Sequence, residues 1–356
     1  MSEDPGAGAD ERTQHPGRYM SAEIAEQPAV FDGLLGNRPE LAEVARRIAE
    51  RKPRFALLAA RGSSDHAALY AKYLVEVLLQ LPAGLVSPST TTLYDARPDL
   101  SEVLLISVSQ SGGSPDMLEV TQAARRDGAT TVAVTNNPDS ALNHAAELSA
   151  DIRAGTERAV AATKTYSATL LTLYLLIDAI RGGKAERVAE LPELARRALE
   201  PSDELDEAVR RYRFADRMLT TGRGYSSATA AEAALKLAET SYLSARAYSG
   251  ADLLHGPVAA VDSETAVLAL CSAGKGGAAM NEVLSTVHER GADICAIGSA
   301  AAGMPCAHSI GLPETPEELA PLLEVLPVQR LALALALERG ADPDSPRGLN
   351  KVTRTR

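Results

Sequence analysis

The stretch VLLISVSQSGGSPDMLEVTQAARRDGATTVAVTNN, residues 103–137, contains in order a short apolar strand, a turn of small residues, an amphipathic helix ending at glycine, and a second strand. The stretch VLALCSAGKGGAAMNEVLSTVHERGADICAIGSAA, residues 267–301, repeats this pattern strand for strand. The glycine pairs of the two turns align, and so do the helix-ending glycines once one residue is dropped. This internal duplication predicts two similar α/β domains rather than one long sheet.

The turn of the first copy carries polar side chains that the second copy lacks. These side chains are Ser109, Gln110, Ser111 and Ser114, and the aligned residues of the second copy are Ala273, Gly274, Lys275 and Ala278. A turn rich in Ser and Gly at the start of a helix presents hydroxyls and free N–H groups to an anion, which is typical of a phosphate cradle. An ordinary serine cap has the same sequence, so one such turn leaves both interpretations open.

A second turn of this kind strengthens the phosphate interpretation. Ser63 and Ser64 follow the apolar strand RFALLAA, in the turn Arg61-Gly62-Ser63-Ser64-Asp65, and precede a segment of helical periodicity. Consecutive parallel strands would place both serine turns at the carboxyl edge of one sheet, where open α/β folds bind ligands. Neither turn matches GxxxxGK[ST] or GxGxxG, so we expect a small phosphorylated metabolite rather than a nucleotide.

Composition narrows the class of protein. The 356 residues, 45% hydrophobic and 23% charged, suffice for two globular domains. The formal net charge of −11 argues against a nucleic-acid partner, because the phosphate backbone requires a basic field. The longest apolar run, from Ala168 to Ile180, is shorter than the roughly 20 residues of a membrane span, and it predicts a buried helix.

Cysteine and histidine spacing gives no sign of a metal site. Cys271, Cys295 and Cys306 lack CxxC spacing and indicate packing residues in a reducing, cytoplasmic protein. No histidine pair has HxxxH or HxH spacing, and we expect neither a metal nor another cofactor.

Changes in composition predict the domain limits. We expect a loose tail at 1–19, a first domain at 20–200, a second domain at 201–345, and a C-terminal tail at 346–356. The N-terminal residues are polar and acidic without the apolar core of a signal peptide, and translation could begin at Met1 or at Met20.

The helix ATAAEAALKLAETSYLSARAY, residues 228–248, places Glu232, Lys236 and Glu239 on one face. On spacing alone this is a solvated row of ion pairs, worth only about 0.3–0.5 kcal/mol each. If the row were buried beside the phosphate site, Lys236 could hold one carboxylate while the other shuttled a proton. His255 follows in a turn before Gly256, where a histidine is more often structural than catalytic.

Four ordered motifs resemble one family. The run AAEAALKLAETSYLSARAYSGADLLHGPVAAVD, residues 230–262, closely resembles part of the isomerase half of glutamine:fructose-6-phosphate amidotransferases and of related amino-sugar-phosphate deaminases. SVSQSGGSPD, AGTERAVAATKTYS and PRGLNKVT match the same family in the same order. The resemblance implies two tandem sugar-isomerase (SIS) domains, each a flavodoxin-like parallel sheet between layers of helices.

The resemblance also implies roles for individual residues. The sugar-phosphate pocket corresponds to Ser63, Ser64, Ser109, Gln110, Ser111 and Ser114, with Val160 and Thr163 in its wall. Glu239 corresponds to the base that moves a proton between C1 and C2, supported by Glu232 and Lys236. His255 corresponds to a ring-opening histidine that reaches the site from a neighbouring subunit, which implies a homodimer. Lys351 corresponds to a lysine that forms an imine with the open-chain ketose.

These roles imply a deaminase that converts glucosamine 6-phosphate to fructose 6-phosphate and ammonia. The chain begins Met-Ser, and we expect no glutaminase domain of the synthases; the turn ARGSSDH in place of their CGTS-type turn resembles the deaminase branch. Four alternatives use the same site: isomerisation without deamination, dehydration of N-acetylglucosamine 6-phosphate, deglycation of a fructosamine 6-phosphate, and sugar-phosphate sensing without catalysis. The sequence distinguishes neither the gluco from the galacto epimer nor a free from an acetylated amine.

Overall fold

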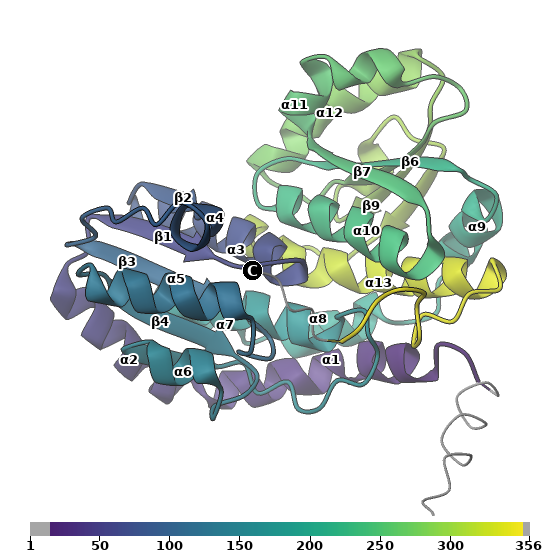
Figure 1. Ribbon diagram of the computed structural model, residues 1–356. Helices are drawn as coiled ribbons and strands as arrows, with labels where there is room; N and C mark the ends of the chain where they lie inside the picture. Colours follow the sequence, from purple (N-terminus) through teal and green to yellow (C-terminus); the bar gives the residue numbers. More distant parts are fainter. Residues whose placement is uncertain (1–14, 352–356) are drawn as a thin grey trace, which may run out of the picture.

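The computed structural model describes residues 15–351 of the chain, so the prediction for most of the 1–19 tail and the choice of Met1 as the start lie outside the described residues. Two five-stranded parallel sheets, each covered by helices on both faces, lie side by side (Figure 1). The fold class expected from the duplication and the resemblance, two tandem α/β domains, is confirmed.

The first sheet has the strand order β2-β1-β3-β4-β5. Its strands are β1 (Phe55–Ala59), β2 (Ala83–Leu85), β3 (Val103–Val108), β4 (Thr130–Thr135) and β5 (Leu148–Asp151). The helices that precede or connect them are α1 (Arg18–Gly36), α2 (Arg38–Arg51), α3 (Ser63–Leu74) with a π-helical extension to Leu79, α4 (Ser89–Thr92), α5 (Pro115–Arg126), α6 (Ala141–Ala145) and α7 (Lys164–Ile180).

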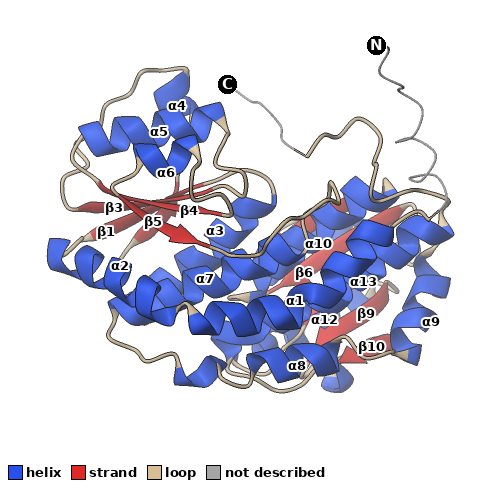
Figure 2. Cartoon of the chain, turned by 90° about the horizontal axis from the view of Figure 1, so that it is seen from below, coloured by secondary structure: helices blue, strands red, loops and turns tan. Residues whose placement is uncertain are grey.

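Each face of this sheet has its own apolar layer. Helices α5 and α6 cover one face, and α2, α3 and α7 cover the other (Figure 2). Nearly every side chain of α7 is buried, because this helix is apolar all round and packs against both α2 and α3. The prediction of a buried helix over the apolar run that ends at Ile180 is therefore confirmed.

The second sheet repeats the first. Its order, β10-β9-β8-β6-β7, becomes the order of the first sheet when it is read from the other edge. The strands are β6 (Arg217–Gly222), β7 (Ser244–Ser249), β8 (Ala266–Leu270), β9 (Asp293–Gly298) and β10 (His308–Gly311). The helices are α8 (Leu191–Ala198) and α9 (Asp203–Tyr212) before the sheet, then α10 (Ser226–Ser241), α11 (Gly250–Leu254), α12 (Lys275–Glu289) and α13 (Ala320–Glu338).

Helix α13 joins the two cores. Leu322 and Leu326 in its first half pack into the core of the first domain, and Leu331 and Leu335 in its second half pack into the core of the second. Helix α1 lies along it (Figure 2). Residues 317–338 are long and apolar enough to cross a membrane, but 83% of the apolar window is buried inside the protein. Burial to this extent is typical of a helix in the core of a folded protein.

Candidate active site

A cavity of about 350 Å³ lies where the carboxyl edge of the first sheet faces α10 of the second domain. The turn after β1 and the turn after β3 both open into it, as expected for consecutive parallel strands. Its lining comprises Arg61, Gly62, Ser63, Ser64, Ser109, Gln110, Ser111, Ser114, Val160, Ala162, Lys236, Glu239, Leu349, Asn350 and Lys351. Ten of the thirteen predicted site residues thus line one cavity.

The local sequence explains why the two serine turns face the cavity. Helix α3 starts at Ser63, directly after Gly62, whose φ of 57° is in the left-handed region that glycine adopts freely. Helix α5 starts at Pro115, after an extended Ser114. In the same turn a side chain at Gly112 would be strained, because its φ is 61° and a Cβ there would lie 2.2 Å from Oγ of Ser140. The N-terminus of α3 and the serine-bearing turn before α5 therefore meet at one place, which suits an anion.

The charged row of α10 is buried, and the solvated interpretation of its spacing is wrong. The side chains of Glu232 and Lys236 are 0% and 1% exposed, and that of Glu239 is 24% exposed. The ammonium of Lys236 forms an ion pair with Glu239 and lies 3.5 Å from Glu232. Burial by itself lowers the pKa of Lys236, but the charges of the two glutamates outweigh it and raise the pKa overall. Lys236 is therefore a permanent cation beside Glu239.

Glu232 lies behind the cavity and connects α10 to α3. Its Oε1 accepts a hydrogen bond from Ser63 Oγ at 2.9 Å, and its Oε2 lies 2.8 Å from Nδ1 of His66. His66 has no metal-binding spacing, so the sequence pattern predicted no role for it. The signal was its place three residues after Ser63, which puts both side chains on one face of α3.

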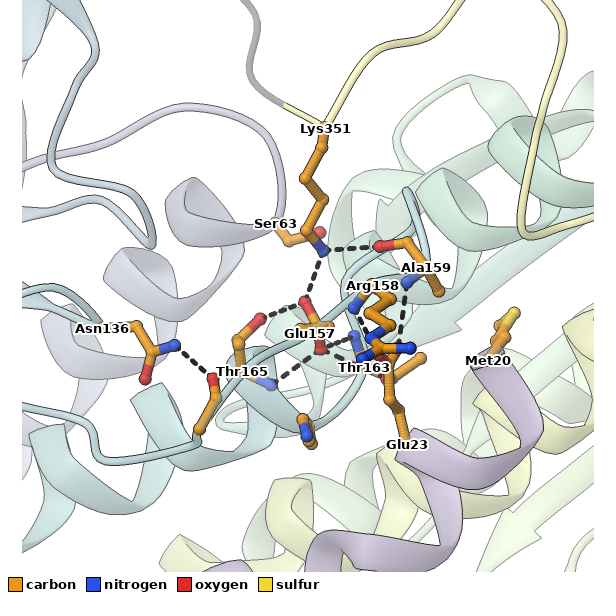
Figure 3. A network of polar contacts seen from close by, with 12 residues as sticks. Met20, Glu23, Ser63, Asn136, Glu157, Arg158, Ala159, Thr163, Thr165 and Lys351 are labelled. Carbon is orange, nitrogen blue, oxygen red and sulfur yellow. Dashed lines mark hydrogen bonds and ion pairs between the residues drawn. The ribbon is translucent and has the colours of Figure 1, made fainter. Parts of the chain in front are cut away.

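A second buried carboxylate holds Lys351 (Figure 3). Nζ of Lys351 donates to Oε2 of Glu157 at 2.7 Å and to the carbonyl of Ala159 at 2.6 Å. Glu157 also accepts hydrogen bonds from the backbone N–H groups of Thr163 and Thr165. Burial raises the pKa of Glu157, but the charge and hydrogen bond of Lys351, with the hydroxyl of Thr165, outweigh burial and lower it overall. Glu157 was missed, although it lies inside the motif AGTERAVAATKTYS.

Three predicted site residues lie off the cavity. Glu232 and Thr163 are buried behind its wall, and Thr163 donates both its N–H and its hydroxyl to Glu157. His255 follows α11 on the exposed surface of the second domain. Within one chain the structure does not bring His255 to the cavity. Among residues 15–351 no three His, Cys, Asp or Glu side chains converge as metal ligands.

Each half of the chain matches the same known protein family. The family model described as the SIS domain matches residues 50–179 and again 212–339, one match on each sheet. The chain belongs to the SIS-domain family. The resemblance noted in the sequence is thereby confirmed, and the two SIS domains are the two halves of the internal duplication.

Relatives of these tandem SIS domains include an aminotransferase. The chain is 34% identical over 341 residues to the glutamine–fructose-6-phosphate aminotransferase (isomerizing) of Methanothermobacter thermautotrophicus; the match covers 94% of this chain and 57% of that protein. The chain thus spans somewhat more than half the length of that relative.

Two solved structures superimpose on the tandem SIS domains. One, from Silicibacter pomeroyi and assigned as a phosphosugar isomerase, has a TM-score of 0.83 and 34% identity over 91% of this chain and 99% of that one. The other is the C-terminal domain of glucosamine-fructose-6-phosphate aminotransferase from Francisella tularensis, with a TM-score of 0.80 and 25% identity over 96% and 99% of the two chains.

Proposed function

We propose that this protein is an amino-sugar 6-phosphate deaminase and isomerase, which converts glucosamine 6-phosphate and water to fructose 6-phosphate and ammonia. The observation that carries the proposal is the single cavity lined by both serine turns, by the carboxylate of Glu239 and by Lys351. A volume of about 350 Å³ is in the range of small-molecule sites. The names of the similar proteins, a fructose-6-phosphate aminotransferase and a phosphosugar isomerase, support the same substrate class.

The serine turns would bind the phosphate and thereby orient the sugar. Free N–H groups at the start of α3, with the hydroxyls of Ser64, Ser111 and Ser114, are donors suited to phosphate oxygens. The other end of the open-chain sugar, with C1 and C2, would then point toward α10 and Lys351. This orientation is what brings the reacting carbons to Glu239.

Glu239 would act as the base. Its carboxylate takes the proton from C2 of the open-chain aldose while the C1 carbonyl oxygen takes up a proton from solvent, which gives the enolamine. It then returns its proton to C1 while the amine nitrogen loses one to solvent, so that C1 becomes an alcohol carbon and the C2 amine becomes a ketimine. The charge of Lys236 beside Glu239 stabilises the electron-rich enolamine between the two transfers. Glu232, buried behind them, positions Lys236 and so acts through it.

Water would complete the reaction at C2. It adds to the ketimine carbon, and the C–N bond breaks to release ammonia and leave the C2 ketone of fructose 6-phosphate. Lys351 offers a covalent route, in which its amine displaces ammonia and water then hydrolyses the enzyme imine. For that route Lys351 must lose a proton, and Glu157, which accepts its hydrogen bond, is the base in contact with it.

We also propose that the protein acts as a homodimer in the reducing cytoplasm. His255 is exposed on the chain that carries it, which fits a residue that opens the sugar ring in the cavity of a neighbouring subunit. The three cysteines are unpaired, and burial raises the pKa of the Cys271 and Cys295 thiols, which keeps both thiols protonated and inert.

The test is incubation of the purified protein with glucosamine 6-phosphate and, separately, with its N-acetyl form, while ammonia, fructose 6-phosphate and ultraviolet absorbance are followed. Ammonia and fructose 6-phosphate from the free amine are the expected products. An absorbing, unsaturated product from the acetylated sugar alone would mean that the same C2 base serves a dehydratase.

The variant Glu239→Gln tests the base and separates catalysis from sensing. We expect its turnover to fall by about 10²–10⁴-fold, with binding of fructose 6-phosphate retained. Glu119→Gln, an exposed change on α5, is the matched control and should behave as wild type. Full turnover in Glu239→Gln would rule out Glu239 as the base; binding without turnover in the wild type would indicate a sensor.

A further inference from the structure

Arg61 connects the two serine turns across the cavity. It belongs to the turn after β1, and its Nε donates to Oδ2 of Asp116 at 2.8 Å. Asp116 lies in the first turn of α5, two residues after Ser114. The carboxylate of Asp116 is fully buried, whereas the arginine side chain is 51% exposed and lines the cavity. The guanidinium is therefore anchored on one edge at the junction of the two turns.

Arg61 is also the cavity cation whose donors remain available. Among the described residues three cations line the cavity, and Lys236 is paired with Glu232 and Glu239. Lys351 is held by Glu157 and a carbonyl. Arginine has five N–H donors, and no described residue accepts a hydrogen bond from the terminal nitrogens of Arg61.

We propose that Arg61 binds the phosphate of the substrate through its terminal nitrogens and sets the preference of the cavity for a phosphorylated sugar. This inference rests on the proposed function, in which both serine turns hold that phosphate. Hydroxyls and backbone N–H groups carry no full charge, and the net charge of −11 opposes the approach of a dianion. A guanidinium matches two phosphate oxygens at once, and its buried partner holds it in place before the ligand arrives.

Calorimetric titration with fructose 6-phosphate and with inorganic phosphate tests the inference without turnover. Arg61→Gln should weaken the binding of both ligands by about 10–100-fold, the usual loss of a hydrogen bond to a charged group. Arg61→Lys keeps a charge but not the planar fork, and should give an intermediate affinity. The matched control is Arg54→Gln, at the other end of β1, where the side chain is 79% exposed and lies 3.7 Å from Glu102.

Chemical modification of the wild type provides a second measurement that does not depend on a variant that folds. Phenylglyoxal should modify Arg61 in the free protein, because its side chain is half exposed, and fructose 6-phosphate should protect it while Arg54 stays reactive. Wild-type affinity in Arg61→Gln, or an Arg61 that reacts equally with and without ligand, would overturn the inference. The wild type could release no ammonia and still show protection of Arg61, with weakened binding in Arg61→Gln. That result would support Arg61 as the phosphate ligand and would reject only the proposed reaction.

Discussion

Glu157 accepts hydrogen bonds from the backbone N–H groups and the hydroxyls of Thr163 and Thr165, so its carboxylate is held in place from the first domain alone, before it meets Lys351. The lysine arrives from 194 residues further along the chain. At the scale of single residues, the position of Lys351 over the cavity thus depends on one buried carboxylate.

Glu157→Gln should lower the free energy of unfolding at pH 7 by about 1–3 kcal/mol, because the amide cannot replace a charged hydrogen bond. The pKa of Glu157 is lower in the folded protein than its ordinary 4.5, so its stabilisation is complete above that pH and disappears as the pH falls through the lowered folded value. Urea unfolding from pH 7 down to about pH 3 measures this. If the difference in free energy of unfolding between wild type and variant stays constant over this pH range, Glu157 is not the stabilising carboxylate. Glu119→Gln is again the exposed control.

At the scale of elements, the two copies of the strand–turn–helix unit differ in what meets the helix N-terminus. In the second copy the carboxylate of Glu317 accepts from the backbone N–H groups of Lys275 and Gly276, at 2.9 Å and 2.7 Å. A Cβ on Gly274 would lie 2.4 Å from this carboxylate. The start of α12 is therefore occupied by an anion from the chain itself, whereas the start of α5 opens into the cavity.

Glu317→Gln should therefore act as the loss of a helix cap. We expect the free energy of unfolding to fall by about 0.5–2 kcal/mol, with fructose 6-phosphate binding in the first domain unchanged. Glu282→Gln, exposed on the same α12, should leave stability at the wild-type value. Equal stability of the two variants in urea would mean that Glu317 does not stabilise α12.

At the scale of the whole molecule, the distance of His255 from the cavity of its own chain calls for a test of shared sites. Equal amounts of Glu239→Gln and His255→Ala chains, each inactive alone, should regain about a quarter of the wild-type activity after subunit exchange, since half of the dimers are mixed and each mixed dimer has one intact site of two. If the mixture releases no more ammonia than either variant alone, the complete sites lie within single chains. Mixing Glu239→Gln with itself is the control for exchange and recovery.

Part of this molecule could be predicted from local pattern. Strand periodicity, helix-ending glycines and the repeated turn predicted two parallel α/β domains, because these signals act within a few residues of one another. The serine turns were predicted on one sheet edge for the same reason: the direction of a parallel strand determines where the turn after it lies.

Burial and pairing could not be predicted in this way. The α10 row has the same spacing whether water or protein covers it, and only the packing of α10 against α3 and α13 buries it. His66 meets Glu232 across 166 residues, and Glu157 meets Lys351 across 194. The sequence by itself thus determined most of the elements and the polar turns, through short-range periodicity and turn chemistry. The helix expected to run to Tyr248 was wrong at its end: α10 stops at Ser241, and residues 244–249 form β7, which pairs with β6. The tertiary structure alone decided which charges lose their water and which partners they find, because those properties depend on segments brought together only by folding.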